Sequence, residues 1–395
     1  MCGIAGFISL KGQTLGNGEK VLKCMGELLA HRGPDGEGTW TDDAGKVGLA
    51  HRRLSIIDLS SAGAQPMKGR DGTIITLNGE IYNYLELQES LSGSWDFSSE
   101  SDTETVLAAY DKYGEDCVDH LRGMFSFAIW DDRKQRLFCA RDRFGIKPFY
   151  YVVVDEVFYF ASEAKALLPV LPDIETDPEA MAEYLTFNFV IGENTLFKGI
   201  KQLLPGHGLM VEGGTLRVWR YWDVNYQVDW DHGEEWFQER LRSLLDDSID
   251  VHLRSDVPVG AYLSGGIDSS LMAILAADKN SQNKEAFHGR FLEYPGYDES
   301  NFAELASEKI GGNLNIIDIT HKDFEENLRK VIYHLDYPVA GPGSFPQFMV
   351  SKLAAEKVKV VLGGQGGDEI FGGYARYLLA YFEQCINAAI DGTYK

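Results

Sequence analysis

The chain has 395 residues, of which 44% are hydrophobic, and its 37 basic and 60 acidic side chains give a net charge of −23. A chain of this length can bury substantial hydrophobic cores without disulfides or metals, and two domains are the default expectation. The strong negative charge and the lack of a basic tract argue against a nucleic-acid scaffold, because such a protein has to neutralise a run of phosphates.

Several further classes are disfavoured by the same inspection. No apolar stretch reaches the roughly 18 residues that a membrane span requires, and the first residues lack the charged and apolar regions of a signal peptide. The five cysteines are odd in number and include no C-x-x-C pair, which argues against a disulfide framework and a zinc site. We therefore expect a soluble, cytoplasmic protein.

The first part of the chain, to about residue 222, predicts sheets sandwiched by helices. Apolar runs bounded by Gly, Asp and Pro predict strands at residues 2–10, 73–82, 124–130, 135–140 and 157–161. Both faces of 124–130 are largely apolar, so this strand has to be covered on both sides. Helical periodicity predicts helices at 19–29 and 103–113, the second with Asp102 as its N-cap.

A different pattern follows residues 223–233, which have no clear period and indicate a linker. Predicted strands lie at 257–263, 286–291, 315–319 and 358–362, and predicted helices at 234–253, 269–277, 301–310, 322–335 and 345–357. Strands that alternate with helices predict a parallel, doubly wound sheet, whose ligands bind at the carboxyl ends of the strands.

A candidate nucleophile stands at the amino terminus. Cys2 directly follows the initiator methionine, whose removal would place a thiol beside a free α-amine. Such an amine titrates near about 8, so at neutral pH a fraction of it is unprotonated and can take the thiol proton. The nucleophile would then carry its own base. Taken alone, the position favours a small apolar residue that opens a strand.

Polar motifs at predicted strand ends offer partners for this thiol. The Asn78 amide and the Gly79 backbone N–H are two adjacent donors for a developing oxyanion. An amino-acid substrate also needs a cation for its carboxylate and an acid for its ammonium group, for which Arg53, Glu80 and Asp102 are candidates. A type I′ hairpin turn at Asn78-Gly79 is an alternative that the sequence supports at least equally.

Two glycine-rich loops follow predicted buried strands. The first loop comprises residues 264–270 and leads at once into a helix. Its two glycines and its serines, with the helix dipole, favour an anion. Asp268 in this loop would repel phosphate unless a divalent cation bridges them, so Mg²⁺ is inferred. The second loop, 363–369, offers another acid, Asp368. A tight turn is the alternative for either loop alone.

Together these features resemble the glutamine-hydrolysing asparagine synthetase family, over essentially the whole chain. The matching motifs are MCGIAG at 1–6, RGPD at 32–35, RLSI at 53–56, NGEIYN at 78–83, SD at 101–102, RD at 141–142, ASE at 161–163 and SGGIDS at 264–269. The resemblance implies an α/β protein of two domains. Residues 2–222 would form an αββα sandwich of the N-terminal-nucleophile hydrolase type, a class II glutamine amidotransferase domain. Residues 223–233 would be the linker, and 234–395 an ATP-pyrophosphatase domain of the adenine-nucleotide α-hydrolase type, incomplete at its C-terminus.

The resemblance also implies residue roles. Cys2 would hydrolyse glutamine to glutamate and ammonia, with Asn78 and Gly79 stabilising the oxyanion. The implied glutamine-binding residues are Arg53, Leu54, Ser55, Ile56, Asn78, Gly79, Glu80 and Asp102. Ammonia would then attack an acyl-adenylate made from ATP, with β-aspartyl-AMP favoured, to give asparagine, AMP and pyrophosphate. The implied ATP- and pyrophosphate-binding residues are Ser264, Gly265, Gly266, Asp268, Ser269, Gly363 and Gly364, with Mg²⁺ on Asp268 and Asp368.

Two departures from the family pattern keep alternatives open. Gln365 stands where the family usually carries a Glu, and an amide cannot act as a base or a charged ligand. The same chemistry on a different carboxylic acid is therefore one alternative. The chain stops at Lys395, where the family normally continues, so glutamine hydrolysis or nucleotide binding alone is another. The expected partners are glutamine, ATP and an acid, with a homodimer suggested by the family, and neither nucleic acid nor a membrane.

Overall fold

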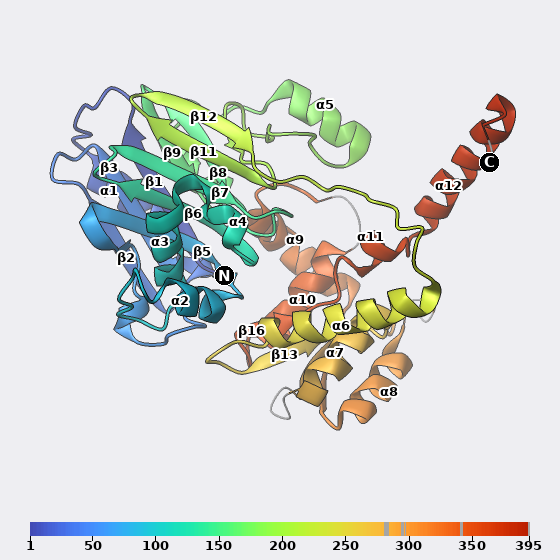
Figure 1. The fold of residues 1–395 in the computed structure, drawn as a ribbon. Coiled ribbons are helices and arrows are strands. Elements are labelled where there is room, and N and C mark those ends of the chain that lie inside the picture. The colour runs from blue at the N-terminus through green and yellow to red at the C-terminus, as the bar shows by residue number, and fades with distance from the viewer. Residues whose placement is uncertain (280–283, 294–295, 297, 340–342, 394–395) are drawn as a thin grey trace. The chain divides into compact units, whose positions relative to one another are not determined.

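The computed structural model describes the chain except residues 280–283, 294–295, 297, 340–342 and 394–395 (Figure 1). The chain divides into two compact units. The N-terminal unit comprises Met1–Gln238 and Leu328–Pro342, and the C-terminal unit comprises Glu239–Asn327 and Gly343–Lys395. Among the described residues, no helix is both long enough and apolar enough to cross a membrane.

The N-terminal unit contains two six-stranded antiparallel sheets. Their strand orders are β10-β8-β9-β1-β3-β2 and β12-β11-β7-β6-β5-β4. The strands are β1 (Gly3–Ser9), β2 (Gly36–Thr41), β3 (Val47–Arg53), β4 (Met67–Lys68), β5 (Thr73–Ile81), β6 (Gly123–Asp131), β7 (Arg136–Arg141), β8 (Tyr150–Val154), β9 (Val157–Ala161), β10 (Lys201–Gln202), β11 (His207–Glu212) and β12 (Thr215–Arg220). The helices are α1 (Gly18–Leu28), α2 (Tyr84–Leu91), α3 (Asp102–Tyr113), α4 (Cys117–His120) and α5 (Pro178–Phe187), with short 3₁₀ helices at Ala30–Arg32, Ser61–Gly63, Arg70–Gly72, Gly114–Asp116 and Ala164–Val170.

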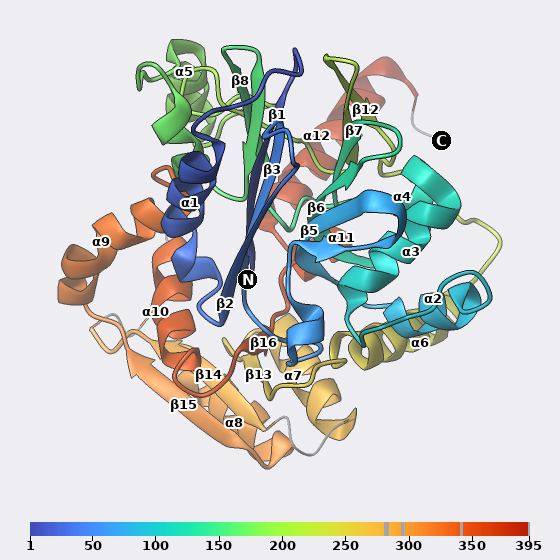
Figure 2. The same ribbon diagram turned by 90° about the vertical axis from the view of Figure 1, so that its left-hand side faces the viewer.

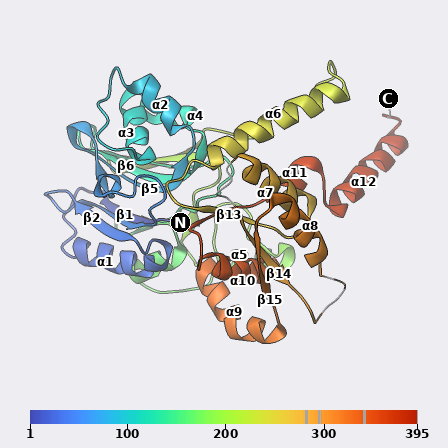
Figure 3. The same ribbon diagram turned by 90° about the horizontal axis from the view of Figure 1, so that it is seen from below.

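These elements form four layers, in the order α1, first sheet, second sheet, and α2 with α3 (Figure 3). Alternation along β6 shows why the sheets stack. Phe125 and Phe127 pack in the core under α3, whereas Ala128 and Trp130 pack in the core between the sheets. Because successive strand residues point to opposite faces, a strand that is apolar on both sides has to lie inside. The predicted αββα sandwich is confirmed.

Two local predictions are wrong. Ser101, and not Asp102, is the N-cap of α3, since the Ser101 side chain accepts a hydrogen bond from the Thr103 N–H at 3.2 Å. Asp102 is the first helical residue, and its carboxylate accepts from the Ile81 N–H at 2.9 Å. The alternative of a hairpin turn at Asn78-Gly79 also fails, because both residues lie within β5 and pair with β6.

The C-terminal unit contains a four-stranded sheet of parallel strands, in the order β15-β14-β13-β16. The strands are β13 (Val259–Tyr262), β14 (Glu285–Arg290), β15 (Asn313–Asp318) and β16 (Val360–Leu362). The helices are α6 (Glu234–His252), α7 (Ile267–Lys279), α8 (Ser300–Ile310), α9 (His321–Leu335), α10 (Ser344–Ala354), α11 (Gly367–Phe371) and α12 (Ala375–Asp391), of which α6 and α9 begin in one unit and end in the other.

Helices cover both faces of this sheet. Ala286 on β14 packs with Ala303 and Ala306 of α8. The opposite face meets α10, where a Cβ at Gly289 would lie 2.8 Å from Val350. Figure 2 shows α8 and α10 on either side of β14. The predicted doubly wound sheet is confirmed, and its topology brings the ends of the parallel strands to one edge.

Candidate active sites

Cys2 lies just before β1, beside the loop that follows β3. The Leu54 N–H donates to Cys2 Sγ at 3.4 Å, and Sγ lies 3.7 Å from the Leu54 carbonyl oxygen. The pairing of β1 with β3 sets Gly3 opposite Arg52, so the sheet register itself brings Cys2 to this loop. Burial raises the pKa of the Cys2 thiol, while the Leu54 N–H and the nearby terminal amine act against this rise. A thiol in such a place needs a base in order to react.

An amine that can serve as this base is buried next to the thiol. Burial, together with the charges of Arg32 and Lys147, lowers the pKa of the Met1 amino group to about 5. At neutral pH these surroundings favour the uncharged amine, which is the form that accepts a proton. Removal of Met1 would give this role to the α-amine of Cys2.

Arg32 holds the main chain at Cys2. Its Nε donates to the Cys2 carbonyl oxygen at 2.9 Å, and its Nη1 donates to Glu163 at 2.7 Å. Its Nη2 is buried and has no hydrogen-bond partner among the described residues. Arg32 is not among the site residues predicted from the sequence, although it stands in the RGPD motif at 32–35. An arginine within one of the motifs that carry the family resemblance is the signal that could have identified it.

Asn78 occupies the middle of β5 and is fully buried. Neither its Oδ1 nor its Nδ2 has a hydrogen-bond partner within the described part of the chain. A buried amide without partners is unusual, because each unsatisfied group costs about 1–3 kcal/mol, and it suggests that a ligand supplies the missing bonds. The neighbouring Gly79 cannot carry a side chain, since a Cβ there would lie 2.5 Å from the Met124 carbonyl oxygen.

Two carboxyl groups lie close together in the same buried region. Burial raises the pKa of Glu80 and of Asp102, and the charge of Asp102 raises that of Glu80 further. A bound cation such as an ammonium group would relieve this repulsion and ionise both groups.

Lys147 is a third charged group in this region and is missing from the sequence-based site residues. Burial lowers the pKa of Lys147, while Glu80 acts in the opposite direction. A single lysine within the apolar run 144–152 is the signal that could have found it.

In the predicted glutamine-binding segment 53–56, Arg53 is the last residue of β3, and residues 54–56 begin the loop that follows. Arg53 Nη1 donates to the Ser60 carbonyl oxygen at 2.8 Å, and its Nη2 donates to the Asp58 carbonyl oxygen. The Ser55 N–H donates to Asp35 at 2.8 Å. Arg53 at the end of β3 is thus fixed by its bonds to the loop, and the next residue, Leu54, contacts the Cys2 sulfur.

In the C-terminal unit, both glycine-rich loops start at the same edge of the sheet. β13 pairs with β16 in parallel, with Ala261 opposite Leu362, so the loops at 263–266 and 363–366 follow adjacent strand ends. In the first loop, Ser264 Oγ and Ser269 Oγ lie 2.9 Å apart, and the Gly266 N–H donates to Ser264 Oγ at 3.3 Å. The helix α7 begins at Ile267, two residues before the predicted start at 269.

Asp268 lies against the second loop. A Cβ at Gly367 would lie 2.3 Å from Asp268 Oδ2, and one at Gly364 would lie 2.9 Å from the Asp268 carbonyl carbon. This contact brings Asp268 to the loop that contains Asp368. No group of three or more His, Cys, Asp or Glu side chains suited to a metal occurs among the described residues. Two carboxylates beside a glycine-rich loop would nevertheless suit Mg²⁺, which takes one or two protein carboxylates together with phosphate oxygens.

Comparison with known proteins decides the family. Residues 1–222 match the family model described as a glutamine amidotransferase domain, and residues 240–393 match the one described as asparagine synthase. The chain is 34% identical to a putative asparagine synthetase [glutamine-hydrolyzing] 2 of Methanocaldococcus jannaschii, over 96% of this chain and 77% of that protein. The chain belongs to the glutamine-hydrolysing asparagine synthetase family.

Several relatives are longer than this chain. It is 39% identical to asparagine synthetase [glutamine-hydrolyzing] 1 of Bacillus subtilis, over 95% of this chain and 59% of that protein. It is also 32% identical to the amidase chry2 of Gibberella zeae, over 95% of this chain and 59% of that protein. The chain thus spans about three fifths of the length of the first relatives that it matches.

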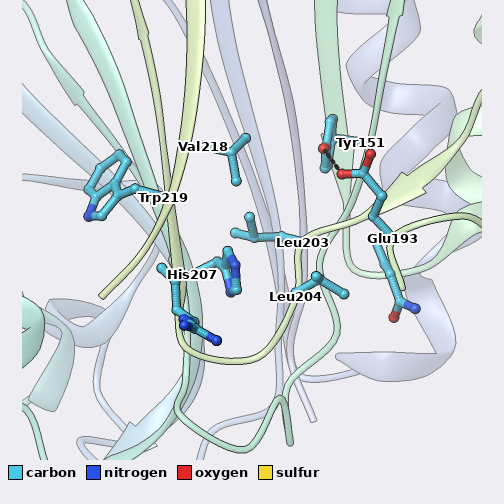
Figure 4. Close-up of a pocket in the computed structure, with 9 residues that line it drawn as sticks. Tyr151, Glu193, Leu203, Leu204, His207, Val218 and Trp219 are labelled. Carbon is cyan, nitrogen blue, oxygen red and sulfur yellow. Dashed lines mark hydrogen bonds between the residues drawn. The ribbon is translucent and has the colours of Figure 1, made fainter. Parts of the chain in front are cut away.

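One pocket of this asparagine synthetase family member contains none of the predicted site residues (Figure 4). It has a volume of about 200 Å³ and lies in the N-terminal unit. Its lining includes Tyr151, whose hydroxyl donates to Glu193 at 3.3 Å, together with His207 and Trp219. None of the lining residues has a buried polar atom without a hydrogen-bond partner, so nothing in the lining indicates a ligand for this pocket.

Proposed function

We propose that residues 2–222 hydrolyse glutamine at Cys2, and that residues 234–395 use the ammonia to amidate a carboxylic acid activated by ATP. The observation that carries this proposal is the Cys2 thiol, which lies 3.4 Å from the Leu54 N–H and beside the amino terminus, where burial lowers the pKa of the Met1 amine. The unpartnered Asn78 amide and the Glu80–Asp102 pair lie in the same unit and supply the remaining chemistry.

The glutaminase step follows from these groups. The neutral α-amine takes the thiol proton, and the thiolate attacks the side-chain carbonyl carbon of glutamine. Asn78 Nδ2 and the Gly79 N–H stabilise the oxyanion. Ammonia leaves with the proton, and water then hydrolyses the thioester to glutamate. Glu80 and Asp102 hold the substrate ammonium group, and Arg53 holds its carboxylate.

The synthetase step would use the two glycine-rich loops. ATP and an acid, with aspartate as the first candidate, form an acyl-adenylate and release pyrophosphate, which the backbone and hydroxyl groups of residues 264–269 bind. Asp268 and Asp368 would hold Mg²⁺, which neutralises phosphate charge. Ammonia attacks the acyl carbon and AMP leaves. Water has to be excluded at this step, because in water ammonia is converted to ammonium, which is not a nucleophile.

A different acceptor acid is the second candidate. Gln365 replaces an acid that the family usually carries, and its Nε2 donates to Gln347 Oε1 at 3.4 Å. An amide at this place cannot attract a substrate ammonium group as a carboxylate does. A relative that is named an amidase, matched over 95% of this chain, also supports a different acceptor acid.

Two assays test these proposals. Glutamate release without ATP measures the glutaminase, and ATP–pyrophosphate exchange with a panel of acids measures the synthetase and identifies its substrate. Cys2→Ala is expected to abolish glutamate release and to spare acid-dependent exchange, while the matched Cys24→Ala in α1 leaves both unchanged. Glutamate release by Cys2→Ala would refute the glutaminase mechanism. Glutamate release without exchange for any acid would favour a glutaminase alone.

A further inference from the structure

A buried chain of alternating charges begins at the carbonyl group of Cys2. Arg32 donates to that carbonyl at 2.9 Å and to Glu163 Oε1 at 2.7 Å. Lys165 Nζ pairs with Glu163 Oε2 on one side and with Asp336 Oδ1 at 2.8 Å on the other. Five groups from four separate segments are thereby joined in one line.

The last member of this chain comes from a distant part of the sequence. Asp336 follows the end of α9 and belongs to the segment Leu328–Pro342. This segment is part of the N-terminal unit, although it lies within residues 240–393, which match the asparagine synthase model. Both of its carboxylate oxygens are used by one residue, because the Lys165 N–H donates to Asp336 Oδ2 at 3.2 Å. His31, next to Arg32, adds a second contact to the segment, with its ring 4.8 Å from that of His334.

The two positive and two negative side chains of this charge network cancel, and all four are almost fully buried. The side chains of Arg32, Glu163, Lys165 and Asp336 are 8%, 6%, 7% and 6% exposed. Burial by itself would raise the pKa of Glu163, but His31, Arg32 and Lys165 lower it to about 2, so Glu163 stays ionised. In such a network each charge depends on its neighbours, and a change at one end alters the geometry at the other.

We propose that Glu163, Lys165 and Asp336 are positioning residues for glutamine hydrolysis, and that they fix the nucleophile Cys2 through Arg32. This inference rests on the proposed glutaminase function. Within the described part of the chain, none of the three is hydrogen-bonded to the segment 53–56 or to the Glu80–Asp102 pair. They therefore position the sulfur and do not bind the substrate. A segment encoded among the synthetase residues thus completes the geometry of the glutaminase nucleophile.

The test uses Asp336→Asn, Lys165→Met and the double variant of the full chain, in a glutamate-release assay. A misplacement of about 1 Å at a nucleophile costs up to about a hundredfold, so we expect kcat to fall about ten- to a hundredfold. KM is expected to stay within about twofold, because the substrate-binding groups are unchanged. In the Lys165→Met background, Asp336→Asn should have little further effect, because Asp336 acts only through Lys165.

A matched ion pair controls for the loss of charge itself. Lys198 and Glu175 lie 2.6 Å apart in the same unit but are mostly exposed, so Lys198→Met and Glu175→Gln should leave kcat unchanged. If Asp336→Asn does not fold, the double variant keeps the charge balance and supplies the same readout. Wild-type kcat in Asp336→Asn or in the double variant, a rise in KM alone, or independent effects of the two changes would each overturn the inference. A wild-type chain that releases no glutamate would instead refute the proposed function, and the inference with it.

Discussion

Replacement of Asn78 by leucine is expected to stabilise the protein while it removes glutaminase activity. Asn78 is fully buried, and both of its amide atoms lack partners among the described residues. Leucine has nearly the same branched shape and no polar atoms to desolvate. An apolar residue of the same shape recovers much of the cost of about 1–3 kcal/mol per unsatisfied group, less a term for the slightly larger volume. We expect a net gain of about 1–3 kcal/mol in the free energy of unfolding of the ligand-free protein.

This gain should be visible as a rise in Tm. For a unit of about 250 residues, 1 kcal/mol corresponds to roughly 2–4 °C, so we expect an increase of at least about 2 °C. Glutamate release should fall by about 10²–10³, which is the usual effect of removing one oxyanion donor. Thermal melting and kcat measured on the same sample would establish both effects.

A control two residues away has the opposite expected sign. Thr76, on the same face of β5, is also fully buried, but its hydroxyl bonds to His51 Nδ1 at 3.1 Å and to the Ala50 carbonyl oxygen at 3.3 Å. Thr76→Val breaks both bonds and should therefore lower Tm. If Asn78→Leu lowered Tm as much as Thr76→Val does, the Asn78 amide would be satisfied without substrate, and the reasoning would be refuted.

Two further results are expected. Because burial raises the pKa of Glu80 above its usual 4.5, the folded protein binds more protons than the unfolded chain above that pH, so stability should decline as the pH rises from about 4.5. Glu80→Gln should flatten this decline in urea titrations across pH, and an unchanged slope would contradict the assignment. Gly367→Ala should remove ATP–pyrophosphate exchange and spare glutamate release, since its Cβ would lie 2.3 Å from Asp268 Oδ2. At Gly343 a Cβ meets none of the described residues within 4 Å, so Gly343→Ala should leave exchange intact. Equal losses in both variants would count against the placement of Asp268.

The sequence by itself determined the class of each half. Alternating apolar residues predicted the strands of the N-terminal sandwich, and the alternation of strands with helices predicted the parallel sheet. Both patterns are local consequences of the periods of strands and helices, so neighbouring residues are enough to reveal them. The chemistry of Cys2, Asn78 and the two glycine-rich loops was proposed on the same basis, because residue type and spacing carry it.

Only the tertiary structure decided which groups meet. The choice between a turn and a strand at Asn78-Gly79 depends on the pairing of β5 with β6. The N-cap of α3 depends on the hydrogen bond between the Asp102 carboxylate and the Ile81 N–H. The chain of charges from Cys2 to Asp336 joins residues more than 330 positions apart, for which no local period exists. Side chains far apart in sequence meet only when the strands have fixed their register, and hence a pattern of residues can suggest a site without showing what holds it in place.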